Sequence, residues 1–265
     1  MSTTTASTAM ASATRTAPRR NALWQLTAIE LKLLVRERMR LVFGVALPLI
    51  LLVIFGAIPS FNKASDTFHG ETTLDVYVPI LVAFSGALLA LTGLPQTLAD
   101  YRERGVLRRL RTTPAGPSRV LAAQLIVNLG IALVTAVVLL VVGRLGYGVP
   151  LPKQVGGFVL AVVLTYLALM GIGLFIASVA PSAKTAQNAG QILFYPMMFF
   201  AGLWMPIAAM PKALQHLSHA MPLGAAVQAL QDASQGDWPH GMQILTLVAW
   251  AVVLLGASAK LFRWE

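Results

Sequence analysis

The amino-acid sequence predicts an all-α membrane protein with six transmembrane helices. Of its 265 residues, 57% are hydrophobic and only 11% are charged, whereas soluble domains carry about 25% charged residues. A spanning helix needs about 20 predominantly apolar residues. Six segments of this kind, none with Asp, Glu, Lys or Arg, occur at residues 41–58, 76–98, 120–143, 155–180, 187–205 and 241–259. Their length and the lack of strand-like alternation favour helices over a barrel.

Two segments precede the six-helix domain, which we place at residues 41–265. Residues 1–20 are mostly Ser, Thr, Ala and Met, a composition that cannot bury a core, so we expect a disordered cytoplasmic tail. Residues 21–40 are predicted to form an amphipathic helix in the membrane interface. Its apolar stripe consists of Trp24, Ala28, Leu31, Val35 and Met39, and its polar side of Gln25, Lys32, Arg36 and Arg40. The alternative is that this helix extends the first span into the cytoplasm.

The connections between the spans contain several prolines. Pro48 is expected to kink the first span, and residues 181–184 form a tight turn between the fourth and fifth spans. Residues 206–231 are apolar but are interrupted by three prolines. Apolar pieces of this length suggest re-entrant or interfacial helices. We therefore expect two half-helices, at 211–219 and 222–231, that dip into the outer leaflet from outside.

The basic residues are divided unequally between the two sides of the membrane. With the amino terminus in the cytoplasm, 16 of the 20 Lys and Arg residues lie on the cytoplasmic side and 4 on the external side. The positive-inside rule therefore predicts that both termini are cytoplasmic. The net charge of +10 follows from this topology and from contact with anionic lipid. We expect no nucleic-acid partner, because no aromatic-rich basic groove accompanies the charge.

The sequence contains no recognisable catalytic or metal-binding arrangement. It has no cysteine, which excludes disulfides and thiolate ligands, and it has no phosphate loop of the G-x-x-x-x-G-K-[ST] type. His216 and His219 are three residues apart, but no third metal ligand is near them. No acidic residue lies within a span, although ion-coupled carriers usually need one. We therefore predict that the chain is not an enzyme and binds no cofactor of its own.

Uncharged polar residues recur at helical spacing within the spans and are candidates for a substrate path. They are Thr92 and Gln96 in the second span, Gln124 and Asn128 in the third, and Asn188, Gln191 and Tyr195 in the fifth. Such side chains often only hydrogen-bond to neighbouring helices, but they also mark transport pathways. For Asn188 and Gln191 both interpretations stay open. The apolar surroundings favour an amphipathic or lipid-like substrate, because a hydrated ion needs a denser polar lining.

The segment between the second and third spans is densely charged. Residues 100–111 hold five arginines and two acidic residues, with Val106, Leu107 and Leu110 among them, and are followed by Thr-Thr-Pro. This composition predicts a short cytoplasmic helix with one apolar side that contacts another protein.

The same segment resembles the signature loop of type-2 ATP-binding-cassette (ABC) exporter permeases. The residues that match the family pattern are Glu103, Gly105, Leu107, Leu110, Thr113 and Pro114. Val106 and Arg108 depart from it, since the family usually has Thr and Glu there. The proline-interrupted series at 202–223 is similar to the external re-entrant hairpin of the family. The resemblance covers about residues 22–262 and is strongest to the daunorubicin and multidrug-resistance permeases.

The resemblance implies a permease subunit of an ATP-driven exporter in the plasma membrane, with a hydrophobic or amphipathic drug, antibiotic or lipid-like cargo. A second copy or a paralogue would pair with it, and a separate nucleotide-binding ATPase subunit would hold ATP and Mg²⁺. The residues expected to couple to that subunit are Asp100, Arg102, Glu103, Arg104, Gly105, Leu107, Arg108 and Leu110. The alternatives are a permease for a lipid-linked glycan or polysaccharide, a membrane scaffold or immunity protein that does not transport, and an ion-coupled carrier.

Overall fold

The computed structural model describes residues 19–36, 42–63, 70–111 and 117–261, and every element in these ranges is a helix. The elements are α1 (Arg19–Arg36), η1 (Val42–Ala46), α3 (Leu47–Ala57), α4 (Thr73–Ala87), η3 (Leu88–Gly93), α5 (Leu94–Glu103), α6 (Val106–Arg111), α7 (Pro117–Tyr147), α8 (Val155–Val179), α9 (Ala183–Phe200), η4 (Ile207–Ala209), α10 (Lys212–Ala220), α11 (Pro222–Gln235) and α12 (Gly241–Leu261). The predicted tail lies outside the described residues, except for Arg19 and Arg20 at the start of α1. Residues 37–40 of the predicted interfacial helix also lie outside them.

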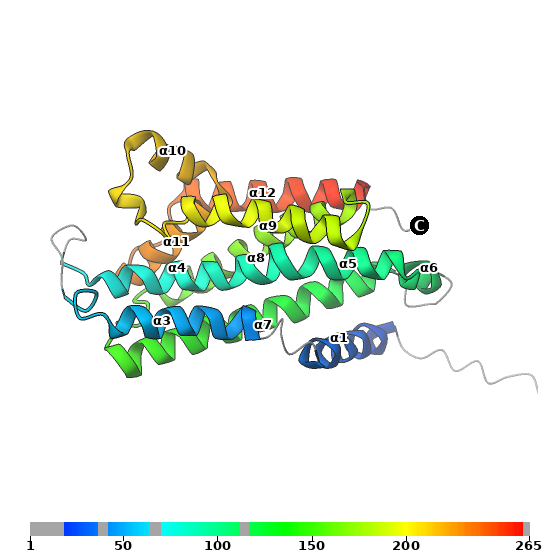
Figure 1. The fold of residues 1–265 in the computed structure, drawn as a ribbon, viewed down its shortest axis with the longest axis horizontal. Coiled ribbons are helices and arrows are strands. Elements are labelled where there is room, and N and C mark those ends of the chain that lie inside the picture. The colour runs from blue at the N-terminus through cyan, green and yellow to red at the C-terminus, as the bar shows by residue number, and fades with distance from the viewer. Residues whose placement is uncertain (1–18, 37–41, 64–69, 112–116, 262–265) are drawn as a thin grey trace, which may run out of the picture.

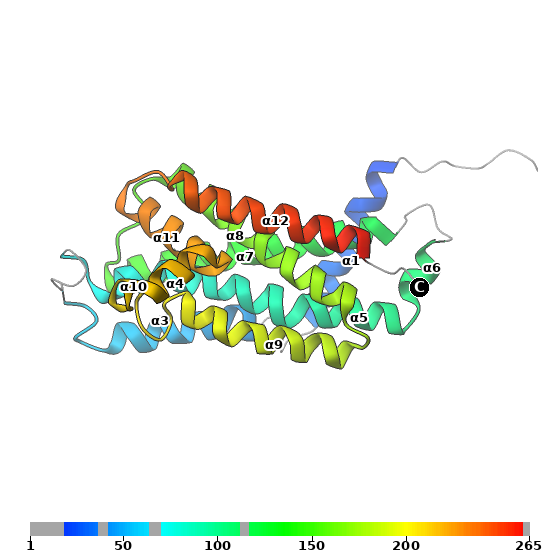
Figure 2. The same cartoon turned by 90° about the horizontal axis from the view of Figure 1, so that it is seen from above.

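The long helices run along one common axis and form an elongated bundle (Figure 1). The connection between α3 and α4 lies at the same end as α10 and α11, whereas α1, α6 and the carboxyl end of α12 lie at the opposite end. Figure 2 shows α1 lying across the bundle axis, unlike the other long helices. We call the two ends the α10 end and the α6 end.

Four of the described helices are long and apolar enough to cross a membrane, by length and composition. They are Thr73–Glu103, Arg119–Tyr147, Val155–Val179 and Gly241–Leu261, and they correspond to the second, third, fourth and sixth predicted spans. The first predicted span is represented by the shorter apolar helix Gly44–Ala57. The fifth corresponds to α9, which has 18 residues and carries Lys, Gln and Asn side chains in its first half. The chain is therefore a helical membrane protein.

The helix formed by α4, η3 and α5 is at the centre of the bundle. Its most apolar 18-residue window is 83% buried, whereas those of α7 and α12 are only 33% and 17% buried. The outer faces of α7 and α12 carry exposed aliphatic side chains, including Val134, Val137, Val252 and Val253. Because such side chains are suited to hydrocarbon, we assign these faces to lipid contact.

A buried tyrosine joins three helices in the core. Tyr166 of α8 is fully buried, and its hydroxyl lies 2.9 Å from the hydroxyl of Ser85 in α4. The Tyr166 hydroxyl also lies 3.3 Å from the carbonyl oxygen of Val82 and 3.4 Å from that of Ala132 in α7. Gly86 leaves room for the ring, because a Cβ there would come within 2.3 Å of it. The polar tip of Tyr166 is thus satisfied inside an apolar core, as burial requires.

The two helices predicted between the fifth and sixth spans are confirmed as α10 and α11. Met221, in an extended conformation, separates them, and Pro222 begins α11. Most of α11 is buried, whereas α10 is largely exposed. The indole nitrogen of Trp250 in α12 donates a hydrogen bond of 3.1 Å to the carbonyl oxygen of Ala220 and so attaches the junction to the bundle.

Candidate functional site

The central helix widens into a π-helical turn at η3 before it continues as α5. Pro95 lies at the start of α5 and has no backbone N–H, so it cannot donate to the carbonyl four residues earlier. The N–H of Leu94 instead donates to Leu89, five residues back. The hydroxyls of Thr92 and Thr97 donate to the carbonyl oxygens of Leu88 (2.6 Å) and Gly93 (3.0 Å). Single π-helical turns inside α-helices are frequent at functional sites.

A groove of about 710 Å³ follows this turn, between the central helix and α9. Its volume lies within the range of about 300–1,000 Å³ that is typical of small-molecule sites. The lining residues are Gly44, Leu88, Leu89, Thr92, Gly93, Gln96, Thr97, Asp100, Tyr101, Arg104, Ala183, Gln187, Gln191, Phe194 and Tyr195. The floor therefore combines apolar side chains with uncharged amide and hydroxyl groups, and charge is confined to one end.

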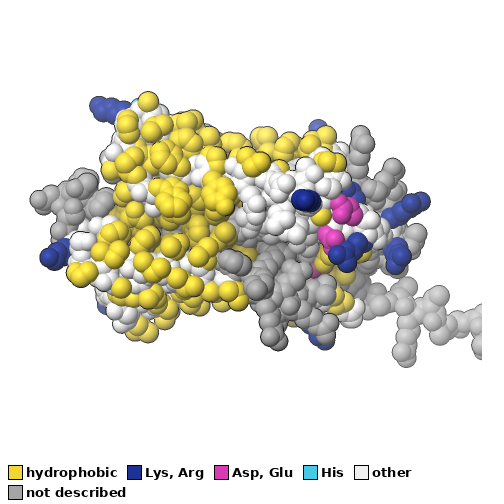
Figure 3. Space-filling model, viewed as in Figure 1, with side chains coloured by type: hydrophobic (Ala, Val, Ile, Leu, Met, Phe, Trp, Pro, Cys, Tyr) yellow, Lys and Arg dark blue, Asp and Glu magenta, His cyan; other side chains and the backbone are white. Residues whose placement is uncertain are grey.

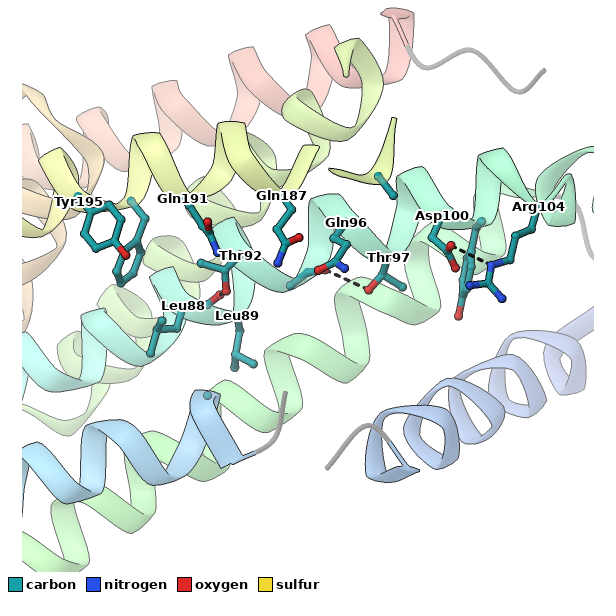
Figure 4. A pocket seen from close by; sticks show the side chains of 15 residues that line it. Leu88, Leu89, Thr92, Gln96, Thr97, Asp100, Arg104, Gln187, Gln191 and Tyr195 are labelled. Atoms are coloured by element: carbon teal, nitrogen blue, oxygen red, sulfur yellow. Dashed lines mark hydrogen bonds and ion pairs between the residues drawn. The ribbon is translucent and has the colours of Figure 1, made fainter. Parts of the chain in front are cut away.

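Two rows of polar side chains line the groove, one on each helix (Figure 4). Thr92, Gln96 and Asp100 follow each other at four-residue steps along η3 and α5. Gln187, Gln191 and Tyr195 form the second row, on α9, with the same four-residue steps. Residues four apart share a helix face, and the two faces lie side by side. Gln96 and Gln191 are exposed, and Tyr195 is 63% exposed.

Close packing between glycines and backbone brings the two rows together. Gly190 of α9 contacts the backbone of η3 so closely that a Cβ on it would lie 1.9 Å from the carbonyl oxygen of Leu91. Gly173 of α8 has the same relation to Ala90, at 2.2 Å. Small residues permit such close approach of membrane helices. These two contacts fix the position of α9 and α8 against the widened turn.

The charged end of the groove lies toward α6. Asp100 and Arg104 form an ion pair of 2.8 Å across one helical turn, with 35% and 73% of their side chains exposed. Such an exposed pair contributes little to stability, about 0–1 kcal/mol. In Figure 3, hydrophobic side chains cover the part of this face nearer to α10, and uncoloured and charged side chains gather toward the α6 end. The polarity of the face therefore increases along the groove.

The prediction of one short helix over residues 100–111 is wrong. Asp100 to Glu103 form the last turn of α5, and a separate helix, α6, begins at Val106. The break occurs at Gly105, which has a φ of 67°. Glycine adopts this left-handed conformation without the steric cost of a Cβ, and the residue therefore ends one helix and permits the next to start in a new direction.

The structure separates the eight predicted coupling residues into three groups. Asp100 and Arg104 line the groove, while Arg102 and Glu103 contact the turn between α8 and α9. Gly105, Leu107, Arg108 and Leu110 belong to the break and to α6. Arg108 is exposed. The side chains of Leu107 and Leu110 lie outside the described part of the structure.

Of the predicted substrate-path residues, Thr92, Gln96, Gln191 and Tyr195 line the groove, and three do not. Asn188 is exposed but does not belong to the groove lining. Gln124 and Asn128 of α7 are buried, and the amide nitrogen of Asn128 donates to the carbonyl oxygen of Gln124 at 2.7 Å.

A buried carboxylate, Glu30 of α1, lies against Gln124 of α7 and was not among the predicted site residues. It is only 7% exposed. It accepts hydrogen bonds from the Gln124 amide at 2.5 Å and from the Tyr101 hydroxyl at 3.1 Å. Trp24 and Leu31 on other sides of α1 are 75% and 48% exposed. Glu30 is the only acidic residue of the basic helix α1. This is the sequence signal that could have indicated a special role for it.

The described residues contain no group of three or more His, Cys, Asp or Glu side chains that could hold a metal ion. The rings of His216 and His219, which are 6.3 Å apart, lie on α10, away from the groove. The site is therefore a polar groove in a helical membrane protein, with a charged junction at one end.

The ABC-2 type transporter family matches residues 21–233. The chain belongs to this family. It is an ABC-2 type permease subunit, a transport component rather than an enzyme. The ABC-2 match covers nearly all of α1, the groove, the junction with α6, α10 and nearly all of α11, whereas α12 lies beyond it.

Three curated relatives are similar to this ABC-2 chain. The probable multidrug ABC transporter permease YbhR of Escherichia coli K12 is 25% identical over 146 residues, which are 55% of this chain and 40% of that protein. The inner membrane transport permease YhhJ of the same organism is 29% identical over 171 residues, which are 61% of this chain and 44% of that protein. Nodulation protein J of Rhizobium meliloti is 28% identical over 104 residues, 38% of this chain and 40% of that protein. The matched regions thus span less than half of each relative.

Proposed function

We propose that this ABC-2 permease is the transmembrane subunit of an ATP-driven exporter. Its cargo would be a hydrophobic or amphipathic drug, antibiotic or lipid-like molecule, moved out of the cytoplasm or the inner leaflet of the plasma membrane. The observation that carries the proposal is the groove between the central helix and α9, in which amide side chains are exposed on a membrane-spanning bundle. The word "multidrug" in the name of YbhR supports the class of cargo.

The exposed amides argue that the groove does not face lipid. A polar group without a partner in hydrocarbon costs several kcal/mol, and Gln96 and Gln191 would both meet acyl chains if this face were on the outside of the complex. Water or protein must therefore cover it. We propose that a second copy of the chain, or a paralogue, brings its own groove to this face, so that the two grooves together enclose a cavity.

The composition of the lining favours an amphipathic cargo. Leu88, Leu89 and Phe194 offer apolar contact, and the glutamines and Thr92 offer uncharged hydrogen-bonding groups. Among the lining residues, only Asp100 and Arg104 carry charge, and they neutralise each other at one end. The groove lacks the dense set of polar groups that would have to replace the water shell of a hydrated ion.

The proposed topology has six spans, with α3 and α9 as the first and fifth, and both termini in the cytoplasm. The asymmetry of Lys and Arg supports this orientation, and it puts the α6 end in the cytoplasm. The basic helix α1 would then lie at the membrane surface, with Trp24 and Leu31 toward the lipid and Glu30 toward the bundle. A separate nucleotide-binding ATPase subunit would bind at α6 and would hold ATP and Mg²⁺.

Copurification from the native membrane tests the proposed assembly. We expect the tagged chain to bring down an ATPase subunit in a 1:1 ratio, with vanadate-sensitive ATP hydrolysis that a transported drug stimulates. The chain without an ATPase partner, in several mild detergents, would contradict the exporter proposal and would favour the membrane scaffold or immunity protein. If a lipid-linked glycan instead of a drug stimulates ATP hydrolysis, the ATP-driven assembly is supported and the proposed cargo is wrong.

Replacement of Gln191 with leucine is expected to change the range of transported substrates more than the amount of protein. The change removes an exposed amide from the groove and keeps a side chain of similar size. Substrates that hydrogen-bond there should lose about 1 kcal/mol of binding free energy, or about fivefold in apparent affinity. Drug-stimulated ATPase with a panel of compounds measures the effect.

Asn188→Leu is the matched control, since Asn188 is exposed on the same helix but outside the groove. It should leave the substrate range as it is. Equal losses of expression in both variants, with no change in substrate selectivity, would show that Gln191 has only a structural role.

A further inference from the structure

The last turn of α5 holds the carboxyl end of α8. The guanidinium of Arg102 donates a hydrogen bond of 3.2 Å to the carbonyl oxygen of Ala177 and a second, short one to that of Ala180. The last four carbonyls of a helix have no partner within it and carry partial negative charge. A cation at this position therefore satisfies groups that the helix itself leaves open.

The neighbouring residue holds the amino end of α9. A carboxylate oxygen of Glu103 accepts a hydrogen bond of 2.7 Å from the backbone N–H of Ala183, the first residue of α9. Ser182 caps the same end by accepting from the N–H of Thr185 at 3.1 Å. The amino end of a helix carries partial positive charge and free N–H groups, so the anion is placed where it is favoured. Arg102 and Glu103 thus hold the two ends of the α8–α9 turn with opposite charges.

An apolar contact lies beneath these two hydrogen-bonded contacts. Ala99 of α5 packs with Ala180 and Ala186, and all three are buried. Ala99, Arg102 and Glu103 are spaced at i, i+3 and i+4, so they share one face of α5. Gln96, Asp100 and Arg104 line the groove from the adjoining part of the same helix end. The end of α5 therefore borders both the groove and the α8–α9 turn.

We infer that Arg102 and Glu103 form a clamp that transmits movement of α6 to the α9 side of the groove. This inference rests on the proposed function, because it needs a partner that moves α6. The chain runs from α6 through Gly105 directly into the clamped turn of α5. From the clamp, α9 continues within one to three turns to Gln187 and Gln191. Arg102 and Glu103 are positioning residues, which act on the groove through α9 and do not touch the cargo.

The rival interpretation is that the clamp only stabilises the fold. It predicts that weakening the clamp lowers thermal stability but leaves the response of the groove to ATP intact. A transmitting clamp predicts the opposite: ATP hydrolysis continues while the groove stops responding. Because the chain has no cysteine, one introduced thiol can report on the groove without a cysteine-free background being made.

The experiment uses the full complex with Gln191→Cys as the reporter, in nanodiscs. The rate of maleimide labelling is measured without nucleotide and after trapping with ATP and vanadate. In the reporter protein we expect the two rates to differ severalfold. Glu103→Ala, which removes the acceptor, should bring the two rates together while ATP hydrolysis persists. Glu103→Gln, whose amide oxygen can still accept from Ala183, should retain part of the difference. Lys184→Ala, which removes an exposed charge beside the clamp, should behave as the reporter.

Hydrogen exchange on the same samples reports the contact itself. Loss of the charged acceptor should speed exchange at the Ala183 amide about tenfold in Glu103→Ala. An unchanged labelling difference in Glu103→Ala, with faster exchange at Ala183, would overturn the transmitting role and leave the proposed function standing. Equal rates with and without nucleotide in the reporter protein would overturn the proposed function, and the transmitting role with it.

Discussion

Gly190→Ala is expected to destabilise the protein more than any other single-methyl change in α9. The added Cβ would lie 1.9 Å from the carbonyl oxygen and 3.0 Å from the carbonyl carbon of Leu91. Both atoms belong to the backbone of the central helix and cannot rotate away. The helices must therefore separate along the whole groove. Overpacking of this kind costs about 1–3 kcal/mol, which corresponds to a melting temperature lower by about 3–10 °C for a chain of this length.

Gly130→Ala is the matched control for this prediction. Gly130 lies in α7, is exposed, and has no atom within 4 Å of an added Cβ. Alanine favours a helix over glycine by about 1 kcal/mol, so the control should melt at the same temperature or slightly higher. Thermal unfolding of both variants in detergent, followed by size-exclusion chromatography, measures the difference. Equal melting temperatures would show that α9 does not pack on the central helix as described.

Glu30→Ala is expected to release α1 from the bundle. The carboxylate accepts hydrogen bonds from Gln124 of α7 and Tyr101 of α5, and it is buried. The substitution leaves the buried amide of Gln124 without its charged acceptor, which costs about 1.5–3 kcal/mol. Local opening of α1 should become at least about tenfold more frequent. Tryptic cleavage after Lys32, an exposed residue of α1, should accelerate by the same factor.

Two further variants test this role of Glu30. Glu30→Gln retains an acceptor and should show a smaller increase in cleavage. Gln25→Ala changes an exposed side chain on the same helix and should leave the cleavage rate close to that of the natural protein. If Glu30→Ala is cleaved no faster than Gln25→Ala, then packing, and not the buried carboxylate, holds α1 in place.

Much of the helical architecture could be predicted because hydrophobicity and helical spacing are local properties. Long uncharged stretches located the four long apolar helices, and Pro211 and Pro222 marked the starts of α10 and α11. The same spacing grouped Gln191 with Tyr195 and Gln124 with Asn128. It could not show that Gly105 would divide the charged segment, because a glycine inside a helical pattern is also tolerated as a helix residue.

The sequence by itself determined the family signature, the apolar spans and the residues that share each helix face. Only the tertiary structure decided which face meets which. Thr92 and Gln96 meet Gln191 across a groove, whereas Gln124 meets a carboxylate 94 residues away. Arg102 and Glu103 contact backbone groups 75 to 80 residues away. Helical periodicity fixes the direction of a side chain relative to its own axis, but the partner across the interface depends on how helices distant in sequence pack. In this protein that packing depends on Gly173 and Gly190, where backbone meets backbone.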